Sequence, residues 1–212
     1  MKNNKMKKLA GMTLIEMLIA IAIFGIGIEG FTLLFSRTWK NNSFVLEMGQ
    51  SSLAVSQGLN KMVNYIRGAR QSDSGAFAIS SANGNDLVLY SDYNKDGVTE
   101  RLHFYKSGSN VFMGTRDPSG TIPKTYQSGD GEVITIAHNI VNADNEPIFY
   151  YYDKEYAGVA NDPPLATPAN VSDVRIIKIY LKTNIDPNRA PNNIEMQSFV
   201  EIRNLNDYDR IQ

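Results

Sequence analysis

An apolar run from Met12 to Phe35 most constrains what this chain can fold into. The run contains 24 residues, and only Glu16 and Glu29 in it are charged. At about 1.5 Å of rise per residue, a helix of this length extends about 36 Å, enough to cross a bilayer core of about 30 Å. The run therefore predicts a membrane-spanning helix close to the N-terminus.

The residues around this run distinguish it from an ordinary export signal. Four lysines and no acidic residue lie in residues 1–11, so we expect a cytoplasmic N-terminus and an exported remainder. A secretory signal peptide places its small-residue cleavage site after the apolar run, whereas Gly11 precedes this one. A plain membrane anchor does not explain Glu16, because a carboxylate inside an apolar span is costly and usually marks a function.

The order of basic leader, Gly11, the pentapeptide MTLIE of residues 12–16 and apolar helix resembles the class III signal of type IV pilins and type II secretion pseudopilins. This resemblance implies that a prepilin peptidase cuts between Gly11 and Met12 and that the new N-terminus at Met12 is methylated. It also implies that Glu16, the fifth residue of the mature chain, acts in filament assembly. Met12 stands where the family more usually has phenylalanine.

The same resemblance implies a location and a set of partners. The precursor would span the inner membrane once, with its leader in the cytoplasm, and would then enter a periplasmic or extracellular filament. Its partners would be the prepilin peptidase, other pilin or pseudopilin subunits and the inner-membrane assembly platform. We expect no nucleic-acid partner, because the four leader lysines leave 17 of the 21 basic residues against 22 acidic ones.

Apolar residues continue at helical spacing beyond the membrane run, through residues 36–71. They are Trp39, Val45, Leu46, Leu53, Val55, Leu59, Met62, Val63 and Ile66. This stripe predicts an amphipathic continuation of the helix that packs on its own domain. The pilin resemblance implies that the rest of the stripe faces neighbouring subunits.

Residues 72–212 show the period of two that is typical of strands. The predicted strands are Asp86–Ser91, Thr99–Lys106, Asn110–Arg116, Glu132–Asn139, Pro147–Asp153, Val174–Thr183 and Glu195–Asn204. Turns rich in glycine, aspartate and proline separate these strands. One long helix followed by mainly antiparallel strands is an α+β layout, as in the pilin fold.

These patterns together define the expected organisation of the chain. We expect a leader at 1–11, a transmembrane and filament-core helix at 12–35, its amphipathic continuation at 36–71 and a β-sheet domain at 72–212. Loose similarities in the strand region resemble the J-type minor pseudopilins and related minor pilins. The sequence therefore favours a minor subunit of a pilus or pseudopilus.

No motif for catalysis stands out in the sequence. The absence of cysteine excludes disulfides, thiolate zinc sites and cysteine nucleophiles. His103 and His138 lie far apart in sequence and form no metal-ligand pattern, and the motifs of serine hydrolases and nucleotide-binding enzymes are missing. We expect a structural protein that is not an enzyme and requires no cofactor.

One predicted loop carries oxygen ligands at the spacing of a calcium site. Asp92, Asn94 and Asp96, followed by a glycine, match the first half of an EF-hand loop, and Glu100 follows at position nine. The glutamate that an EF-hand needs at position twelve is replaced by His103. Two interpretations stay open, a calcium site formed by the four oxygen-bearing residues or a hairpin with an Asp-Gly turn.

The alternation of side chains along the next strand bears on this choice. Glu100 shares a strand face with Leu102 and Phe104, so we expect its carboxylate to turn toward the loop and not toward solvent. In the plain-turn interpretation, Lys95 and Arg101 would balance the acidic charges.

A second function, from a different class, also fits the sequence. The chain would then be a surface-anchored adhesin that binds a glycan or a protein through the strand Tyr150-Tyr151-Tyr152 or through the proline-rich loop Tyr156–Ser172. Consecutive residues in a strand alternate between its faces, so we expect at least one of these tyrosines to be exposed and the others to pack in the core.

Overall fold

The computed structural model describes residues 11–159, 162–186, 188 and 192–206. The longest element is helix α1, Leu14–Arg67. The chain divides into two compact units, Met1–Leu46 and Glu47–Gln212, so α1 contributes to both. Each unit is considered by itself.

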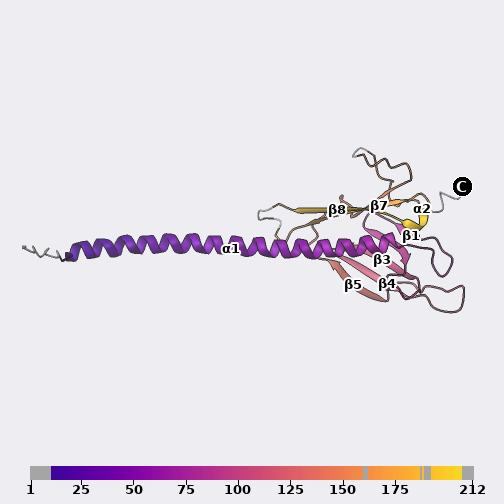
Figure 1. The fold of residues 1–212 in the computed structure, drawn as a ribbon, viewed down its shortest axis with the longest axis horizontal. Coiled ribbons are helices and arrows are strands. Elements are labelled where there is room, and N and C mark those ends of the chain that lie inside the picture. The colour runs from indigo at the N-terminus through magenta and orange to yellow at the C-terminus, as the bar shows by residue number, and fades with distance from the viewer. Residues whose placement is uncertain (1–10, 160–161, 187, 189–191, 207–212) are drawn as a thin grey trace, which may run out of the picture. The chain divides into compact units, whose positions relative to one another are not determined.

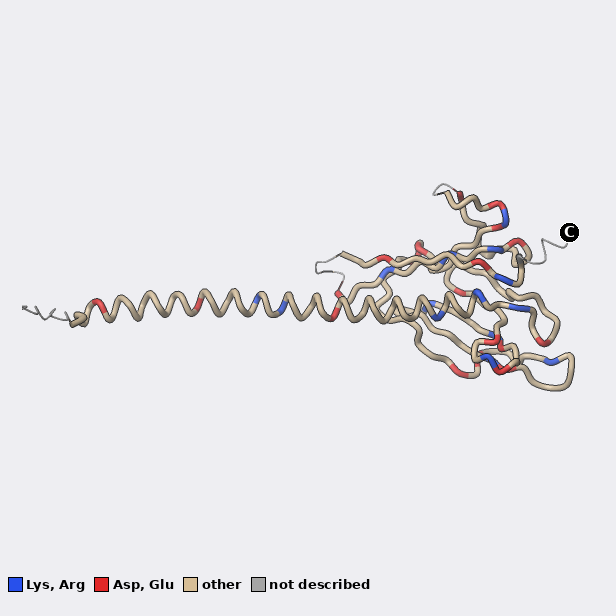
Figure 2. Tube along the Cα trace, in the orientation of Figure 1, with Lys and Arg blue, Asp and Glu red and all other residues tan. Residues whose placement is uncertain are grey.

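The described part of the first unit consists almost entirely of the N-terminal portion of α1. Residues 11–42 are all exposed. The rings of Phe31, Phe35 and Trp39 stack one turn apart, with successive centroids 6.2 Å apart. Figure 2 shows only isolated charges along this portion. By length and composition α1 can span a membrane, in agreement with the predicted span.

The second unit contains two antiparallel sheets, each built from strands that pair in chain order. The five-stranded sheet is formed by β1 (Ile79–Ala82), β2 (Asp86–Ser91), β3 (Glu100–Ser107), β4 (Asn110–Arg116) and β5 (Glu132–Ala137). The three-stranded sheet is formed by β6 (Phe149–Tyr152), β7 (Ile176–Thr183) and β8 (Ile194–Glu201), and the short helix α2 (Arg203–Asn206) follows it.

The core of this unit lies where the C-terminal turns of α1 meet the two sheets, which Figure 1 shows on opposite sides of the helix. The helix contributes one apolar face, formed by Val55, Leu59, Met62, Val63 and Ile66. Alternate residues of the central strands cover it, and examples are Leu102, Phe104, Ile177 and Ile179. This arrangement confirms the α+β fold with a helix packed on antiparallel sheets. Of the predicted stripe, Trp39, Val45, Leu46 and Leu53 remain exposed.

Gly58 sets how closely α1 approaches β5. A Cβ added at this position would lie 2.2 Å from the carbonyl oxygen of Ile136, a distance that no side chain can adopt. Glycine weakens an isolated helix by up to about 1 kcal/mol relative to alanine. Here that cost is offset by close packing of the helix against the strand.

Polar contacts join the two sheets next to the β1–β2 turn. The buried Tyr151 hydroxyl donates to the Asn83 carbonyl oxygen at 2.6 Å, and the Ile148 N–H donates to Asn85 Oδ1 at 3.1 Å. Burial raises the pKa of Tyr151 well above its usual range, so the phenol stays neutral and remains a donor. A hydrogen bond in this dry setting fixes the separation of β6 from the turn.

The observed elements differ from the predicted ones mainly at their ends. Helix α1 ends at Arg67 and not at residue 71, because the backbone of Ala69 already pairs with Ser91 at the sheet. Strand β1 is not among the predicted strands, since its four residues include two serines. Strand β8 ends at Glu201 instead of residue 204, and α2 takes up the remainder. The other strands agree with prediction to within two residues at either end.

Candidate functional site

The predicted cleavage position lies directly before the first turn of α1. Gly11, Met12 and Thr13 are exposed and non-helical, and a side chain at Gly11 would meet nothing within 4 Å. Exposed, non-helical backbone is the form of chain that proteases cleave most readily. The leader lysines lie outside the described residues.

Glu16 closes a capping box with Thr13 at the start of α1. The N–H and the hydroxyl of Thr13 each donate to Glu16 Oε2 at 2.8 Å, and the Glu16 N–H donates to Thr13 Oγ1 at 3.3 Å. Such a box satisfies two backbone N–H groups that a helix start leaves without partners. The assembly role of Glu16 stays a prediction. Its capping role was not predicted, although the T-x-x-E spacing before an apolar run is the signal for it.

The loop between β2 and β3 contains the four predicted calcium ligands, and its own N–H groups already bond to several of their oxygens. Asp92 accepts hydrogen bonds from the N–H groups of Asp96 at 3.1 Å and of Gly97 at 3.2 Å. Asn94 accepts one from the Asp96 N–H at 3.0 Å and donates to Asp96 Oδ2 at 2.9 Å. The turn depends on left-handed backbone at Gly97, where φ is 90°.

Glu100 is the buried member of this group. It is 1% exposed and accepts a hydrogen bond from the Tyr93 N–H at 3.4 Å, which confirms that its carboxyl group turns toward the loop. Burial raises the pKa of Glu100, and the nearby charges of Asp96 and Asp92 raise it further. The N–H of Tyr93 acts in the opposite direction. The hydrogen bond from Tyr93 connects this carboxyl group to the start of the loop.

The cations near this loop are not the expected ones. Arg70, at the end of α1, lies 3.4 Å from Asp92, whereas Arg101 pairs with Asp130 at 2.8 Å. Both ring nitrogens of His103 are also bonded to carboxylates, Nδ1 to Asp130 at 2.9 Å and Nε2 to Asp86 at 2.7 Å. These contacts hold the β4–β5 loop against β3. Across the described ranges, no three His, Cys, Asp or Glu residues are grouped so as to hold a metal ion.

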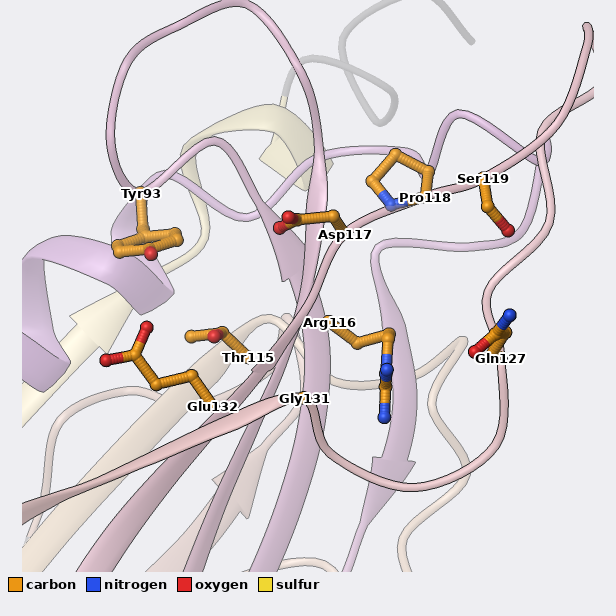
Figure 3. Close-up of a pocket in the computed structure, with 9 residues that line it drawn as sticks. All are labelled: Tyr93, Thr115, Arg116, Asp117, Pro118, Ser119, Gln127, Gly131 and Glu132. Atoms are coloured by element: carbon orange, nitrogen blue, oxygen red, sulfur yellow. The ribbon is translucent and has the colours of Figure 1, made fainter.

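A polar cavity of about 420 Å³ lies beside the acidic loop, where β4 ends and β5 begins; we call it the β4–β5 cavity. It is lined by Tyr93, Thr115, Arg116, Asp117, Pro118, Ser119, Gln127, Gly131 and Glu132. Figure 3 shows the carboxylates of Asp117 and Glu132 on the same side as Tyr93, with the Arg116 guanidinium farther away, toward Gln127. The sequence gives no local signal for this cavity, because its residues come from three separate segments.

The tyrosine strand and the proline-rich loop meet at a second cavity, of about 260 Å³. It is lined by Tyr152, Asp153, Glu155, Tyr156, Asp162, Pro163 and Leu165. Tyr151 points into the core, whereas Tyr150 is partly exposed and lies near Lys178, whose Nζ is 5.3 Å from its ring centroid. The tyrosines therefore alternate as predicted, and Tyr152 is covered by Tyr156, with ring centroids 4.2 Å apart.

The burial of Glu100 predicts a pH-dependent cost to stability. Because the folded state binds this proton more tightly than the unfolded state, the wild type loses stability as the pH rises through the raised pKa of Glu100. Glu100→Gln keeps an oxygen for the Tyr93 N–H but carries no charge. It should unfold at higher urea concentration than wild type at pH 7, with the difference shrinking toward pH 5.

Urea unfolding of residues 36–212, followed by near-ultraviolet circular dichroism in the presence of a chelator, measures this difference. Glu155→Gln, at an exposed carboxylate, is the matched control and should show no such pH-dependent gain. A constant difference between wild type and Glu100→Gln from pH 5 to pH 7 would contradict the assignment of the cost to this carboxyl group.

Comparison with known proteins identifies the N-terminal segment. A family model described as the prokaryotic N-terminal methylation motif matches residues 6–28, a segment that contains Gly11, Met12 and Glu16. No curated protein was found to match the chain. The match agrees with the exposed position before α1 and with the long apolar helix that follows it. The chain therefore carries, at residues 6–28, the N-terminal methylation motif that is the class III signal of type IV pilins and pseudopilins.

Proposed function

We propose that this chain is a minor subunit of a type IV pilus or a type II secretion pseudopilus. The observation that carries the proposal is the class III signal, which is followed directly by a helix of 54 residues. The signal implies processing by a prepilin peptidase, anchoring in a membrane and assembly with other subunits. The assignment as a minor subunit rests on the resemblance of the strand region to J-type pseudopilins and related minor pilins.

The exposed apolar surface of α1 supports assembly as the activity. Large apolar side chains from Leu14 to Phe35 are more than half exposed, and water is a poor environment for a surface of this kind. Lipid covers such a helix before assembly, and apolar faces of neighbouring helices can replace lipid in a filament. The helix would then pass from the membrane into the filament core without changing its secondary structure.

Glu16 would set the axial position of each subunit. Cleavage after Gly11 creates a positive charge at Met12, next to the positive end of the helix dipole, where a cation is unfavourable. The carboxylate of Glu16 lies one turn away and can neutralise this charge in the same subunit or in the preceding one. A charge pair among apolar helices is costly to break, so it would fix a register that apolar packing alone specifies poorly.

Leader removal is the direct test of the proposal. Co-expression with a prepilin peptidase should give a membrane protein whose intact mass corresponds to residues 12–212 plus one methyl group. The class III signal predicts this cut because the small residue precedes the apolar run. A mass that retains residues 1–11, or one that indicates cleavage after Phe35, would overturn the assignment.

A substitution series at the capping box separates the two roles of Glu16. Glu16→Gln can still close the box but has no charge, whereas Thr13→Ala keeps the charge and removes the hydroxyl. If register depends on charge, Glu16→Gln and Glu16→Ala should both reduce the subunit in sheared filaments, or reduce filament number. Thr13→Ala should stay closer to wild type, since loss of a cap costs only about 0.5–2 kcal/mol.

Controls distinguish a defect in filament assembly from a defect in membrane insertion or processing. Membrane insertion and leader cleavage should be the same in all variants, because every substitution keeps the basic leader, the Gly11–Met12 junction and the apolar run. Wild-type filament incorporation in Glu16→Gln, together with a loss in Thr13→Ala, would show that the cap and not the charge is required.

Calcium binding by the β2–β3 loop is a separate proposal. Asp92, Asp96 and Glu100 place three carboxylates within nine residues, and a cation would relieve their repulsion. A carboxylate oxygen that accepts one N–H keeps a second lone pair, so the loop's own hydrogen bonds leave it able to coordinate an ion. Backbone carbonyls would have to complete the coordination shell.

The calcium proposal is tested by melting residues 36–212 with millimolar calcium and with chelator. Calcium that binds only the folded state should raise the melting temperature by mass action, and Asp96→Ala should abolish the rise. Glu155→Gln should leave it unchanged. An equal melting temperature of the wild type in both buffers would leave only the Asp-Gly turn interpretation.

The alternative function, a surface-anchored adhesin, is supported by one observation. The two segments that the sequence singles out, the tyrosine strand and the proline-rich loop, both line the 260 Å³ cavity. The genes adjacent to this one distinguish the two functions. Several neighbouring reading frames with short basic leaders and the same G-x-x-x-x-E spacing would favour filament machinery over a lone adhesin.

A further inference from the structure

His103 of β3 is bonded to two carboxylates at once, on opposite sides of its ring. Its Nδ1 lies 2.9 Å from Asp130 Oδ2, and its Nε2 lies 2.7 Å from Asp86 Oδ2. Ionised carboxylates only accept hydrogen bonds, so both ring nitrogens have to be donors. A neutral imidazole has one N–H, whereas the imidazolium has two. The two contacts are therefore complete only when His103 is protonated.

Asp130 brings the end of the β4–β5 loop to this ring. Its side chain lies over Gly114, the residue of β4 that pairs with His103, and a Cβ added at Gly114 would lie 2.3 Å from the Asp130 carboxyl carbon. Glycine at this position leaves room for the carboxyl group to reach β3. After Asp130 the chain returns to β4, where the Gly131 N–H donates to the Thr115 carbonyl oxygen at 2.8 Å. The position of this loop end therefore depends on what holds Asp130.

Arg101 is the second group that holds Asp130. Its guanidinium donates to Asp130 Oδ1 at 2.8 Å and to the Gly129 carbonyl oxygen at 2.9 Å. Arginine stays charged at every pH at which the domain is expected to work, so this contact does not change with pH. Histidine, in contrast, ordinarily changes charge between about pH 5 and pH 8. Of these two contacts to Asp130, the one from His103 is therefore the one that responds to pH.

The other charged and titratable side chains on this face of the sheet do not change charge in that range. The described residues of these types that β2, β3 and β4 place there, besides His103, are Asp86, Tyr90, Arg101, Tyr105 and Arg116. Strand β5 contributes Val133 and Thr135, which carry no charge. Aspartate, tyrosine and arginine ordinarily keep one charge state between about pH 5 and pH 8. A pH-dependent change in this cluster is therefore assigned to His103.

We propose that Asp86, His103 and Asp130 form a pH-sensitive latch that holds the end of the β4–β5 loop on β3. With His103 protonated, both contacts are ion pairs and the latch is closed. When the ring loses its proton, it keeps one N–H for Asp130, whose side chain is 15% exposed. Its other nitrogen then presents a lone pair to Asp86, which is 41% exposed and can turn into water. The remaining bond lacks the attraction between two charges, so the loop end opens more often as the pH rises.

Opening of the latch changes one wall of the β4–β5 cavity. Gly131, which lines that cavity, directly follows Asp130 in the chain. The rest of the loop keeps other attachments, for example the ion pair of Lys124 with Asp73 at 2.9 Å. The latch therefore acts on the segment around Asp130 and not on the whole loop. The proposal concerns the sheet domain alone and stands whether or not the chain forms filaments.

The test uses the ¹⁵N-labelled full chain in detergent micelles, with chelator present. The ring nitrogen shifts of His103 give the pH at which the ring loses its proton. Amide exchange rates, each divided by the intrinsic rate at the same pH, are then compared on the two sides of that pH. The Gly131 N–H should exchange about tenfold faster on the high-pH side, as expected for the weakening of one hydrogen bond between ions. The Phe104 N–H, in the core part of β3, reports global unfolding and should change less.

Three variants separate the latch from other effects of pH. His138→Gln removes the other histidine of the chain and should keep the tenfold change. His103→Phe keeps a ring beside Tyr105 but has no N–H, so Gly131 should exchange at the faster rate on both sides of the same pH. In Asp86→Asn the amide can donate to the neutral ring or accept from the protonated one, so the change should be smaller than in wild type.

Several results would overturn the proposal. They are a His103 ring that does not titrate between about pH 5 and pH 9, an equal change in exchange at Gly131 and Phe104, and a pH-dependent change that persists in His103→Phe. An undiminished change in Asp86→Asn would also overturn it, because Asp86 would then be no part of the latch. Since Asp86 is partly exposed, its substitution leaves the fold intact, and the test does not depend on whether His103→Phe folds.

Discussion

Between Val55 and Ile66, α1 turns one apolar face toward both sheets, and the arrangement of the domain depends on the burial of that face. Neither sheet could stand alone, because a three-stranded or five-stranded meander leaves its own apolar side in water unless another layer covers it. One helix serves as that layer for both sheets. The absence of a side chain at Gly58 then lets β5 approach the helix, so that Ile136 and Ala137 join the core.

The acidic β2–β3 loop and the β4–β5 cavity lie at the same end of the five-stranded sheet. Antiparallel register places Ser91 opposite Glu100 and Arg101 opposite Arg116, so the β2–β3 and β4–β5 loops emerge side by side. Glu100 links them, since its buried carboxyl group accepts the Tyr93 N–H and so positions the wall of the neighbouring cavity.

The elements that the sequence predicts well are those whose signal is local. The helix follows from apolar spacing, the strands from alternation, and the burial of Glu100 from its shared face with Leu102 and Phe104. The side-chain partners were less predictable. The plain-turn interpretation predicts that Lys95 and Arg101 balance the acidic charges, whereas Arg101 pairs with Asp130 and Arg70 reaches Asp92, because the end of α1 pairs with the sheet there.

The two cavities illustrate the same limit. Their lining residues come from segments that become neighbours only once strand register and loop path are fixed, and no spacing rule encodes either. The hydrogen bonds of His103 to Asp86 and Asp130 also join three segments, although no sequence motif marks any of the three residues. The sequence shows which side chains are present, but it does not show which distant segments the fold brings together.

The capping box at the start of α1 has a consequence for maturation. Every atom of the box belongs to Thr13 and Glu16, on the side of the predicted cut that the mature chain keeps. Removal of the leader therefore takes away none of the hydrogen bonds that begin the helix. The precursor and the mature protein can therefore share the same helix start, and the first turn of α1 does not have to re-form after cleavage.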